Sequence, residues 1–220
     1  MAISSLTTLT ADNILNGMLK TDKINTFESL LRSTGRQGIE EVISFLKGTD
    51  FYTAPSSASY HSNYEGGLLD HSLLVYATAC KLKNVYLELK PELAGRLDDN
   101  SIIISALLHD ICKTEFYKVK TKWKKNENDQ WQSYNGYEIS DSFPIGHGEK
   151  SVIMLLTLGL KLTPEEMIAI RFHMGSWDGA LLTNDVKFSY QNAMNECPLL
   201  PLLQTADNTS SLLLETQNKS

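Results

Sequence analysis

Apolar residues recur at intervals of three and four through most of the chain, which is the spacing of one face of a helix. Near the N-terminus two such sets stand on either side of a glycine-containing break at residues 35–38: Ile24, Phe27, Leu30 and Leu31, then Ile39, Val42, Ile43 and Leu46. The spacing predicts two helices, because glycine commonly ends one helix before the next begins. We therefore expect residues 1–50 to form a helical N-terminal lead packed on the core.

Further helices are predicted along the rest of the chain. A loop rich in Ser, Ala and Gly at residues 53–66 precedes them, and a capping box at Thr163–Glu166 marks one helix start. The segment from Ser101 to Cys112 is apolar nearly all round, which is typical of a central buried helix. The predicted helices are Leu68 to about Leu82, Ser101 to Cys112, Pro164 to His173, Asp185 to Asn195 and Leu199 to Glu215.

The pattern changes to period two between residues 116 and 139. Lysines alternate with other residues from Tyr117 to Lys124, a polar turn follows at residues 126–129, and aromatic residues resume at Trp131. This pattern predicts a β-hairpin. The expected fold is therefore mostly α, a helical bundle at residues 51–215 with a small hairpin insertion at about 116–139. Residues 216–220 are expected to form a frayed tail.

Composition and charge narrow the function classes. The chain of 220 residues is 42% hydrophobic and 21% charged, which is ordinary for a globular protein. It has no apolar run near the roughly 20 residues that span a bilayer, and its start lacks the features of a signal peptide, so no membrane partner is expected. Three widely spaced cysteines favour reduced thiols and a cytoplasmic location. The net charge of −6 argues against nucleic acid as the main partner.

Four of the five histidines form an ordered series with aspartates. Any one of them alone is more often a hydrogen-bonded core residue, and Asp207 alone is compatible with a helix N-cap. The pair His109-Asp110 ends the most apolar predicted helix, where unsatisfied polar groups would cost several kcal/mol. Taken together the six side chains favour one metal centre built from distant segments: His71, His109, Asp110, His147, His173 and Asp207.

The contexts of these residues resemble the HD-domain phosphohydrolase superfamily. The resemblance runs from Tyr60 to about Ser211, with Cys112 where the family usually has glycine. It implies an HD-domain helical bundle holding two divalent ions, which would be Mn, Fe, Mg, Co, Ni or Zn. It also implies that Asp110 bridges the ions, with His71, His109 and Asp207 at one and His147 and His173 at the other. The segments that carry the resemblance are LLDHS at 68–72, ALLHDICK at 106–113, IGHG at 145–148, RFHMG at 171–175 and QTADN at 204–208.

Two bound ions can activate a hydroxide and polarise a phosphoryl oxygen. The expected activity is therefore hydrolysis of a phosphoester or phosphoanhydride of a nucleotide or related small phosphate compound. Asp110 and Lys113 are the predicted catalytic residues, and His61, Lys113 and Lys150 are the predicted substrate contacts. A histidine like His61 also precedes the first ligand in bacterial 3′-5′ exoribonucleases and in HD-containing conjugative relaxases. The simpler alternatives are a solvated helix-end lysine for Lys113 and a polar loop histidine for His61.

Other functions remain open from the sequence. A 3′-5′ exonuclease acting on single-stranded nucleic acid would use the lysine-rich hairpin and its tryptophans as a platform. The simpler explanation of those lysines is a solvated strand face that deters edge pairing. A di-iron HD-type oxygenase would use the same ligand set, and a non-catalytic nucleotide sensor is a third class. The sequence indicates no oligomeric state.

Overall fold

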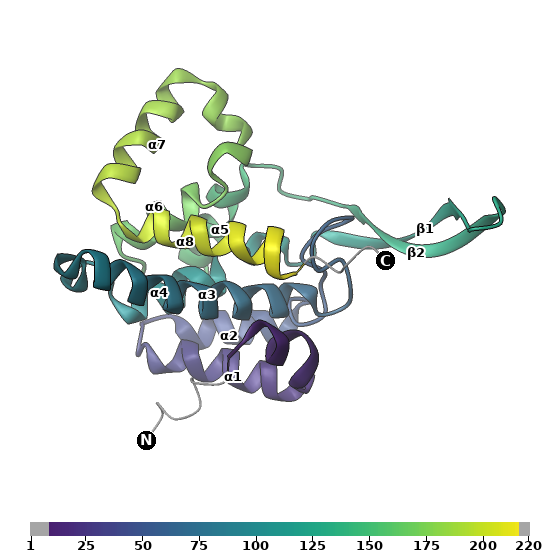
Figure 1. Ribbon diagram of the computed structural model, residues 1–220, viewed down its shortest axis with the longest axis horizontal. Coiled ribbons are helices and arrows are strands. Elements are labelled where there is room, and N and C mark those ends of the chain that lie inside the picture. Colours follow the sequence, from purple (N-terminus) through teal and green to yellow (C-terminus); the bar gives the residue numbers. More distant parts are fainter. Residues whose placement is uncertain (1–8, 216–220) are drawn as a thin grey trace.

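The fold is mostly α, as predicted, and the computed structural model describes residues 9–215. After a π-helical turn at Asn13–Gly17, the two predicted N-terminal helices follow as α1 (Lys20–Ser33) and α2 (Ile39–Gly48). They lie on one side of the bundle, below α3 and α4 in Figure 1. The predicted frayed tail at 216–220 lies outside the described residues.

Three helices form the centre of the bundle. The long helix α3 (Gly67–Leu89) packs against both α4 (Asp99–Leu108) and α8 (Leu199–Thr209), and α4 also contacts α8. Residues 102–108 of α4 are all buried, which confirms the prediction of a central apolar helix. These helices form the apolar core next to the histidine series.

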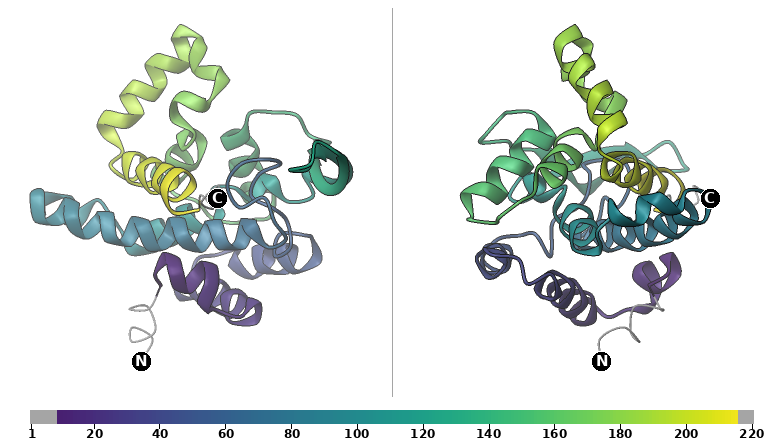
Figure 2. Two further views of the ribbon diagram at one scale, coloured as in Figure 1. Left: turned by 45° about the vertical axis from the view of Figure 1, so that its right-hand side comes forward. Right: turned by 90° about the vertical axis from the view of Figure 1, so that its left-hand side faces the viewer.

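Two further helices close the bundle beside α8. Helix α6 (Pro164–Phe172) packs on α8 and α4, and α5 (His147–Thr157) packs on α6. The capping box at Thr163 and Glu166 is present. Helix α7 (Asn184–Glu196) extends away from the body before the chain returns into α8 (Figure 2). Short 3₁₀ turns occupy Pro91–Gly95, Ile111–Lys113, Gly175–Trp177 and Gly179–Leu182.

Some predicted helix ends were wrong. Helix α3 continues to Leu89 rather than Leu82, and α4 ends at Leu108 rather than Cys112. Asp110 has φ −105° and ψ 19°, outside the α region, so the helical hydrogen-bond ladder stops before it. His109 and Asp110 therefore lie just past α4 and not in its last turn. The last helix is α-helical only to Thr209 and continues as a π-helical turn at Ser210–Leu214.

The predicted hairpin is confirmed. Strands β1 (Tyr117–Lys125) and β2 (Trp131–Ile139) pair antiparallel, in a register that runs from Tyr117 opposite Ile139 to Lys125 opposite Trp131. Together they project from the bundle as a narrow arm (Figure 1). Within the described part of the chain, no helix has both the length and the apolar character needed to cross a membrane.

A fully buried carboxylate joins the N-terminal helices to the bundle. Glu166 accepts two hydrogen bonds from the Arg36 guanidinium at 2.7 and 2.8 Å, and another from Ser101 Oγ at 2.7 Å. Its side chain has no exposed surface, while Arg36 is 16% exposed. One carboxylate thus links the α1–α2 connection, the start of α4 and the start of α6.

Glu166→Ala is expected to destabilise the protein by about 3–5 kcal/mol, because it leaves the largely buried Arg36 guanidinium without its partner. The measurement is urea unfolding followed by circular dichroism. Glu40→Ala is the matched control, since the Arg32–Glu40 pair is 43% and 63% exposed and its loss should cost less than about 1 kcal/mol. Equal losses in the two variants would contradict this assignment.

Candidate metal centre

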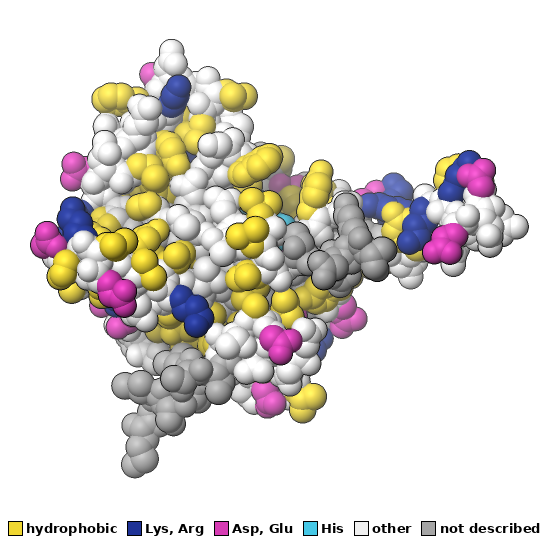
Figure 3. Space-filling view, viewed as in Figure 1, with side chains coloured by type: hydrophobic (Ala, Val, Ile, Leu, Met, Phe, Trp, Pro, Cys, Tyr) yellow, Lys and Arg dark blue, Asp and Glu magenta, His cyan; other side chains and the backbone are white. Residues whose placement is uncertain are grey.

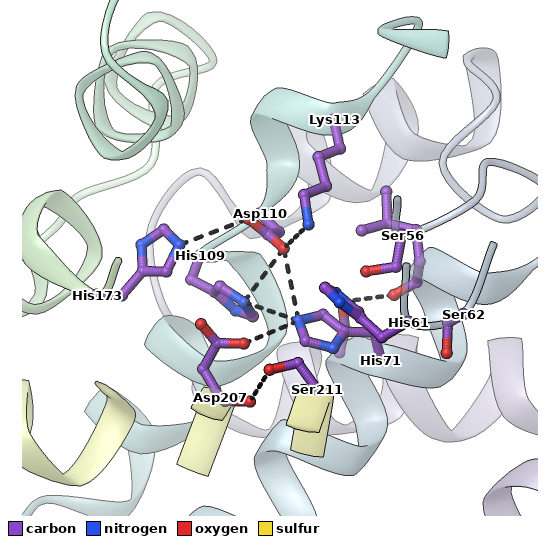
Figure 4. Close-up of polar contacts among 12 residues, drawn as sticks. Ser56, His61, Ser62, His71, His109, Asp110, Lys113, His173, Asp207 and Ser211 are labelled. Atoms are coloured by element: carbon purple, nitrogen blue, oxygen red, sulfur yellow. Dashed lines mark hydrogen bonds and ion pairs between the residues drawn. The ribbon is translucent and has the colours of Figure 1, made fainter. Parts of the chain in front are cut away.

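The structure brings all six predicted ligands together from five parts of the chain. His71 lies in the first turns of α3, His109 and Asp110 follow α4, His147 opens α5, His173 follows α6, and Asp207 lies in α8. Their ligand-type atoms form overlapping groups whose members lie within 4.8 Å of one another. Figure 4 shows most of these side chains pointing toward a common centre.

The carboxylate of Asp110 is the hub of this cluster. Its Oδ1 lies 2.7 Å from His147 Nε2 and 3.5 Å from His173 Nε2. Its Oδ2 lies 2.6 Å from Lys113 Nζ, 3.4 Å from His109 Nε2 and 3.5 Å from His71 Nε2. The side chain is 3% exposed. The two oxygens therefore face two different sets of histidines.

Hydrogen bonds on the far side of two imidazoles fix which nitrogen carries the proton. His109 Nδ1 lies 2.9 Å from the Ala106 carbonyl oxygen, and His173 Nδ1 lies 2.7 Å from the Ile170 carbonyl oxygen. A carbonyl oxygen only accepts, so both Nδ1 atoms donate. In the neutral rings each Nε2 is then a bare acceptor aimed at the centre. This is the tautomer that metal-ligating histidines adopt.

In the neutral rings, these acceptors face one another without a donor between them. His71 Nε2 lies 3.2 Å from His109 Nε2 and 3.3 Å from Asp207 Oδ1. His173 Nε2 is buried and has no hydrogen-bond partner among the described residues. Lone pairs held at such distances repel unless a proton or a metal cation lies between them. The donor set of imidazole nitrogens and carboxylate oxygens fits a divalent first-row cation.

Glu215 is a member of the site that the sequence analysis missed. Its Oε1 lies 2.7 Å from His71 Nδ1, and its Oε2 accepts a hydrogen bond from Ser62 Oγ at 2.7 Å. In a regular α-helix, eight residues would rotate Glu215 roughly 80° away from Asp207. The π-helical turn at Ser210–Leu214 advances less per residue and reduces this offset. Without knowledge of that turn, helical spacing gives no reason to place Glu215 beside His71.

Two glycines allow the segments of the site to approach closely. A Cβ on Gly148 would lie 2.2 Å from the Arg171 carbonyl oxygen, so glycine lets α5 and α6 come together next to His147 and His173. A Cβ on Gly67 would lie 2.0 Å from the Ser62 carbonyl oxygen. Glycine there lets the 53–66 loop close onto the start of α3, where it places His61 with its ring centre 5.1 Å from that of His71.

Cys112 lies beside the most exposed of the ligand histidines. Its Sγ lies 3.4 Å from His147 Nδ1, and the residue is 1% exposed. Burial, followed by the negative charge of Asp110, raises the pKa of the Cys112 thiol to about 12. The thiol is therefore neutral near pH 7 and packs against the ring of His147.

The predicted substrate contacts lie in different surroundings. Lys113 is buried against Asp110, and His61 lies next to His71 with a buried Nε2 that has no hydrogen-bond partner among the described residues. The Lys150 ammonium instead pairs with Asp141 and lies 5.1 Å from the centre of the Phe116 ring. Lys113 and His61 thus border the cluster, whereas Lys150 is held to one side by its own carboxylate.

The cluster attracts positive charge. Burial alone would lower the pKa of His71, but the carboxylates of Glu215, Asp110 and Asp207 raise it well above its usual value. Burial likewise opposes the charge on Asp110, yet Lys113 and His109 hold its pKa well below the usual range. Burial, then the charges of His71 and Lys113, lower the pKa of His61 to about 4. His61 is therefore neutral near pH 7.

Comparison with known proteins agrees with this geometry. The HD-domain family matches residues 68–212, which include all six clustered ligands. The chain belongs to the HD-domain family. A further similarity, at 36% identity over 90 residues, is to a dihydroneopterin 2′,3′-cyclic phosphate phosphodiesterase of Methanocaldococcus jannaschii. That match covers 36% of this chain and 35% of the relative, so this chain spans about a third of the relative's length. No solved structure shows significant similarity to the chain.

The stability of this HD-domain protein without metal is expected to fall as pH rises above about 7. His71 and His173 have raised pKa values in the folded state, so the folded state keeps protons that the unfolded chain releases as pH rises through about 6.5. His61 and His147 have lowered pKa values, so they oppose this change near pH 6.5, where the unfolded chain still protonates them in part, and add little above about pH 7.5. Each retained proton contributes a slope of up to about 1.4 kcal/mol per pH unit.

Urea unfolding in the presence of a chelator, between about pH 7 and 8.5, measures this slope. His71→Asn should flatten the slope, since it removes the group with the strongly raised pKa. A free energy of unfolding that rises across this window in the unaltered protein would contradict the assignment.

Proposed function

We propose that the protein is a metal-dependent phosphohydrolase that acts on a phosphoester or phosphoanhydride of a nucleotide or related small phosphate compound. The observation that carries the proposal is the set of buried Nε2 atoms that face one another and the two carboxylates across the centre, where only protons or cations can compensate their lone pairs. Such an arrangement is costly in a folded protein unless cations occupy it. Membership of the HD-domain family supports the same conclusion.

The two oxygens of Asp110 divide the ligands into two groups. His71 and His109 lie at Oδ2 and, with Asp207 beside His71, would hold one divalent ion. His147 and His173 lie at Oδ1 and would complete the site of a second. Bound ions of this kind supply a hydroxide at neutral pH and polarise a phosphoryl oxygen. Glu215 would keep the His71 ring oriented by accepting its Nδ1 proton.

Lys113 and His61 are the side chains best placed to bind substrate. Burial opposes the charge of Lys113, but Asp110 raises its pKa, so the ammonium stays charged. Lys113 would be held less tightly by Asp110 when that carboxylate also faces bound ions, and its ammonium would then bind a phosphoryl oxygen of the substrate. His61 is neutral and has a free nitrogen for a second oxygen of the substrate. Lys150 would add a further contact only on leaving Asp141.

The substrate class rests on two findings. The partly similar relative is named as a phosphodiesterase of a small cyclic phosphate, which supports a compact phosphoester over a polymer. The net charge of −6 favours a small substrate over a long polyanion. A substrate screen should therefore include 2′,3′-cyclic nucleotides beside nucleoside mono-, di- and triphosphates.

Asp110→Ala is expected to abolish bound metal and phosphate release, because it removes the carboxylate shared by both groups of ligands. Metal is measured by mass spectrometry of the purified protein, and activity by the substrate screen with manganese. Asp178→Ala is the control, since Asp178 is also a largely covered carboxylate, 13% exposed, but pairs with Arg171. Circular dichroism verifies that both variants are folded.

The outcomes separate the alternatives. Full metal content or activity in Asp110→Ala would refute the role of this residue. Iron with oxygen consumption and no phosphate release would favour an oxygenase. Absence of metal from the unaltered protein, with no hydrolysis of any compound in the screen, would refute the proposed function and favour a nucleotide sensor.

Lys113→Ala is expected to lower kcat/KM by about 100-fold or more, because a charged donor to the phosphoryl group is lost. Metal content should be retained, which distinguishes this effect from loss of a ligand. Lys187→Ala, which changes an exposed lysine of α7, is the control. Lys150→Ala tests the third predicted contact, with a smaller effect expected because Asp141 holds that ammonium. Unchanged kcat/KM in Lys113→Ala would remove Lys113 from the mechanism.

A further inference from the structure

The two faces of the projecting arm differ in chemistry. Residues directly opposite each other in an antiparallel pair share a face, and residues two apart along a strand do so too. The register therefore separates the side chains into two sets. We call the first set the aromatic face: Tyr117, Val119, Thr121, Trp123, Lys125, Trp131, Ser133, Asn135, Tyr137 and Ile139. The other is the lysine face: Lys118, Lys120, Lys122, Lys124, Gln132, Tyr134, Gly136 and Glu138.

The aromatic face is largely exposed. Trp123 and Trp131 are 62% and 66% exposed, and Val119 and Ile139 are 65% and 62% exposed. Only near the body is it partly covered, where the Tyr117 hydroxyl donates a hydrogen bond to the Ser56 carbonyl oxygen at 3.3 Å. A two-stranded hairpin on its own is marginally stable in water. The exposed aromatic face therefore indicates that another surface packs against the arm.

The distribution of charge indicates what covers it. The single lysine on the aromatic face, Lys125, pairs with Asp129 at 2.7 Å and lies 5.9 Å from the centre of the Trp131 ring. The remaining arm lysines point to the opposite side. Nucleic acid held against the aromatic face would have its phosphates turned away from those lysines, whereas an apolar partner there leaves the lysines in solvent. The arm shows both kinds of side chain in Figure 3.

We propose that the aromatic face is a dimer interface and that the arms of two copies of this chain pack face to face. This inference is independent of the proposed function. In such a pair the lysine faces point outward on opposite sides, so like charges are not brought together. Two small sheets would stack about 10 Å apart, as in a β-sandwich.

The face can pair with a second copy of itself. Its tryptophans, Trp123 and Trp131, lie near the tip, and Val119 and Ile139 lie nearer the body, each paired with a tyrosine of the other strand. A two-fold axis near Thr121 and Asn135 places the tryptophans of one arm against these aliphatic and tyrosine side chains of the other, so apolar surface meets apolar surface along the whole face.

The available area fits a specific dimer. A tryptophan buries about 150–250 Å² when it is fully covered, and Trp123 and Trp131 have about two thirds of their surface left to bury. The four tryptophans of two arms, together with the exposed surface of Val119 and Ile139 from both, can therefore approach the roughly 1,000 Å² that a specific interface needs. The arrangement also brings each tip to the base of the partner arm, beside the loop that carries Ser56 and His61.

The test compares full-length variants by sedimentation velocity over a range of protein concentrations. The unaltered chain is expected to dimerise, and Trp123→Ser with Trp131→Ser should weaken dimerisation at least about 100-fold, since two central tryptophans are lost. Lys118→Ser with Lys122→Ser, on the lysine face of the same arm, is the matched control and should leave the dimer intact.

A second measurement does not depend on removing the tryptophans. Thr121→Cys lies near the proposed two-fold axis and should be linked into a dimer by a short bis-maleimide reagent, because facing residues of stacked sheets lie about 10 Å apart, which is too far for a disulfide. Lys122→Cys on the opposite face should not be linked. A monomeric unaltered chain at all concentrations would overturn the proposal. Equal cross-linking of both cysteine variants would also overturn it, as would a monomer that binds an oligothymidine through the tryptophans.

Discussion

The buried carboxylate of Asp110 is the constraint on which the arrangement of the site depends. One side chain with 3% exposure meets Lys113 and four histidines. The histidines lie in α3 and α5 or directly after α4 and α6. A buried carboxylate requires compensating positive charge or hydrogen bonds. The fold satisfies this requirement by directing segments far apart in sequence toward one point. The glycines at 67 and 148 matter because they allow those segments to come close enough.

The same convergence lowers the stability of the protein without a cation and makes the site suited to binding one. Imidazole nitrogens with their outer protons committed to backbone carbonyls or Glu215 present lone pairs to one another. Without a cation, the positive charge that the carboxylates require comes from Lys113 and from histidines whose pKa values are raised. A site that stabilises a cation at the expense of the isolated fold is typical of functional positions, where local stability is given up for binding.

The arm presents a different physical problem. Its amphipathic alternation gives an aromatic face that the bundle does not cover and a lysine face that resists edge-to-edge pairing. The arm begins only a few residues after Lys113, and Tyr117 contacts the backbone of the loop that carries His61. Association through the arm and binding at the histidine cluster are thus close in space, although they use different side chains.

The local pattern of the sequence determined the helices, the hairpin and the six side chains of the histidine-aspartate series, because periodicity and residue type are properties of short segments. It did not determine where α4 ends, since Asp110 leaves the helical region to turn its carboxylate inward. It did not reveal Glu215, which reaches His71 through a π-helical turn, or the pairing of Lys150 with Asp141. These features arise from packing between segments far apart in the chain, and only the tertiary structure could decide them.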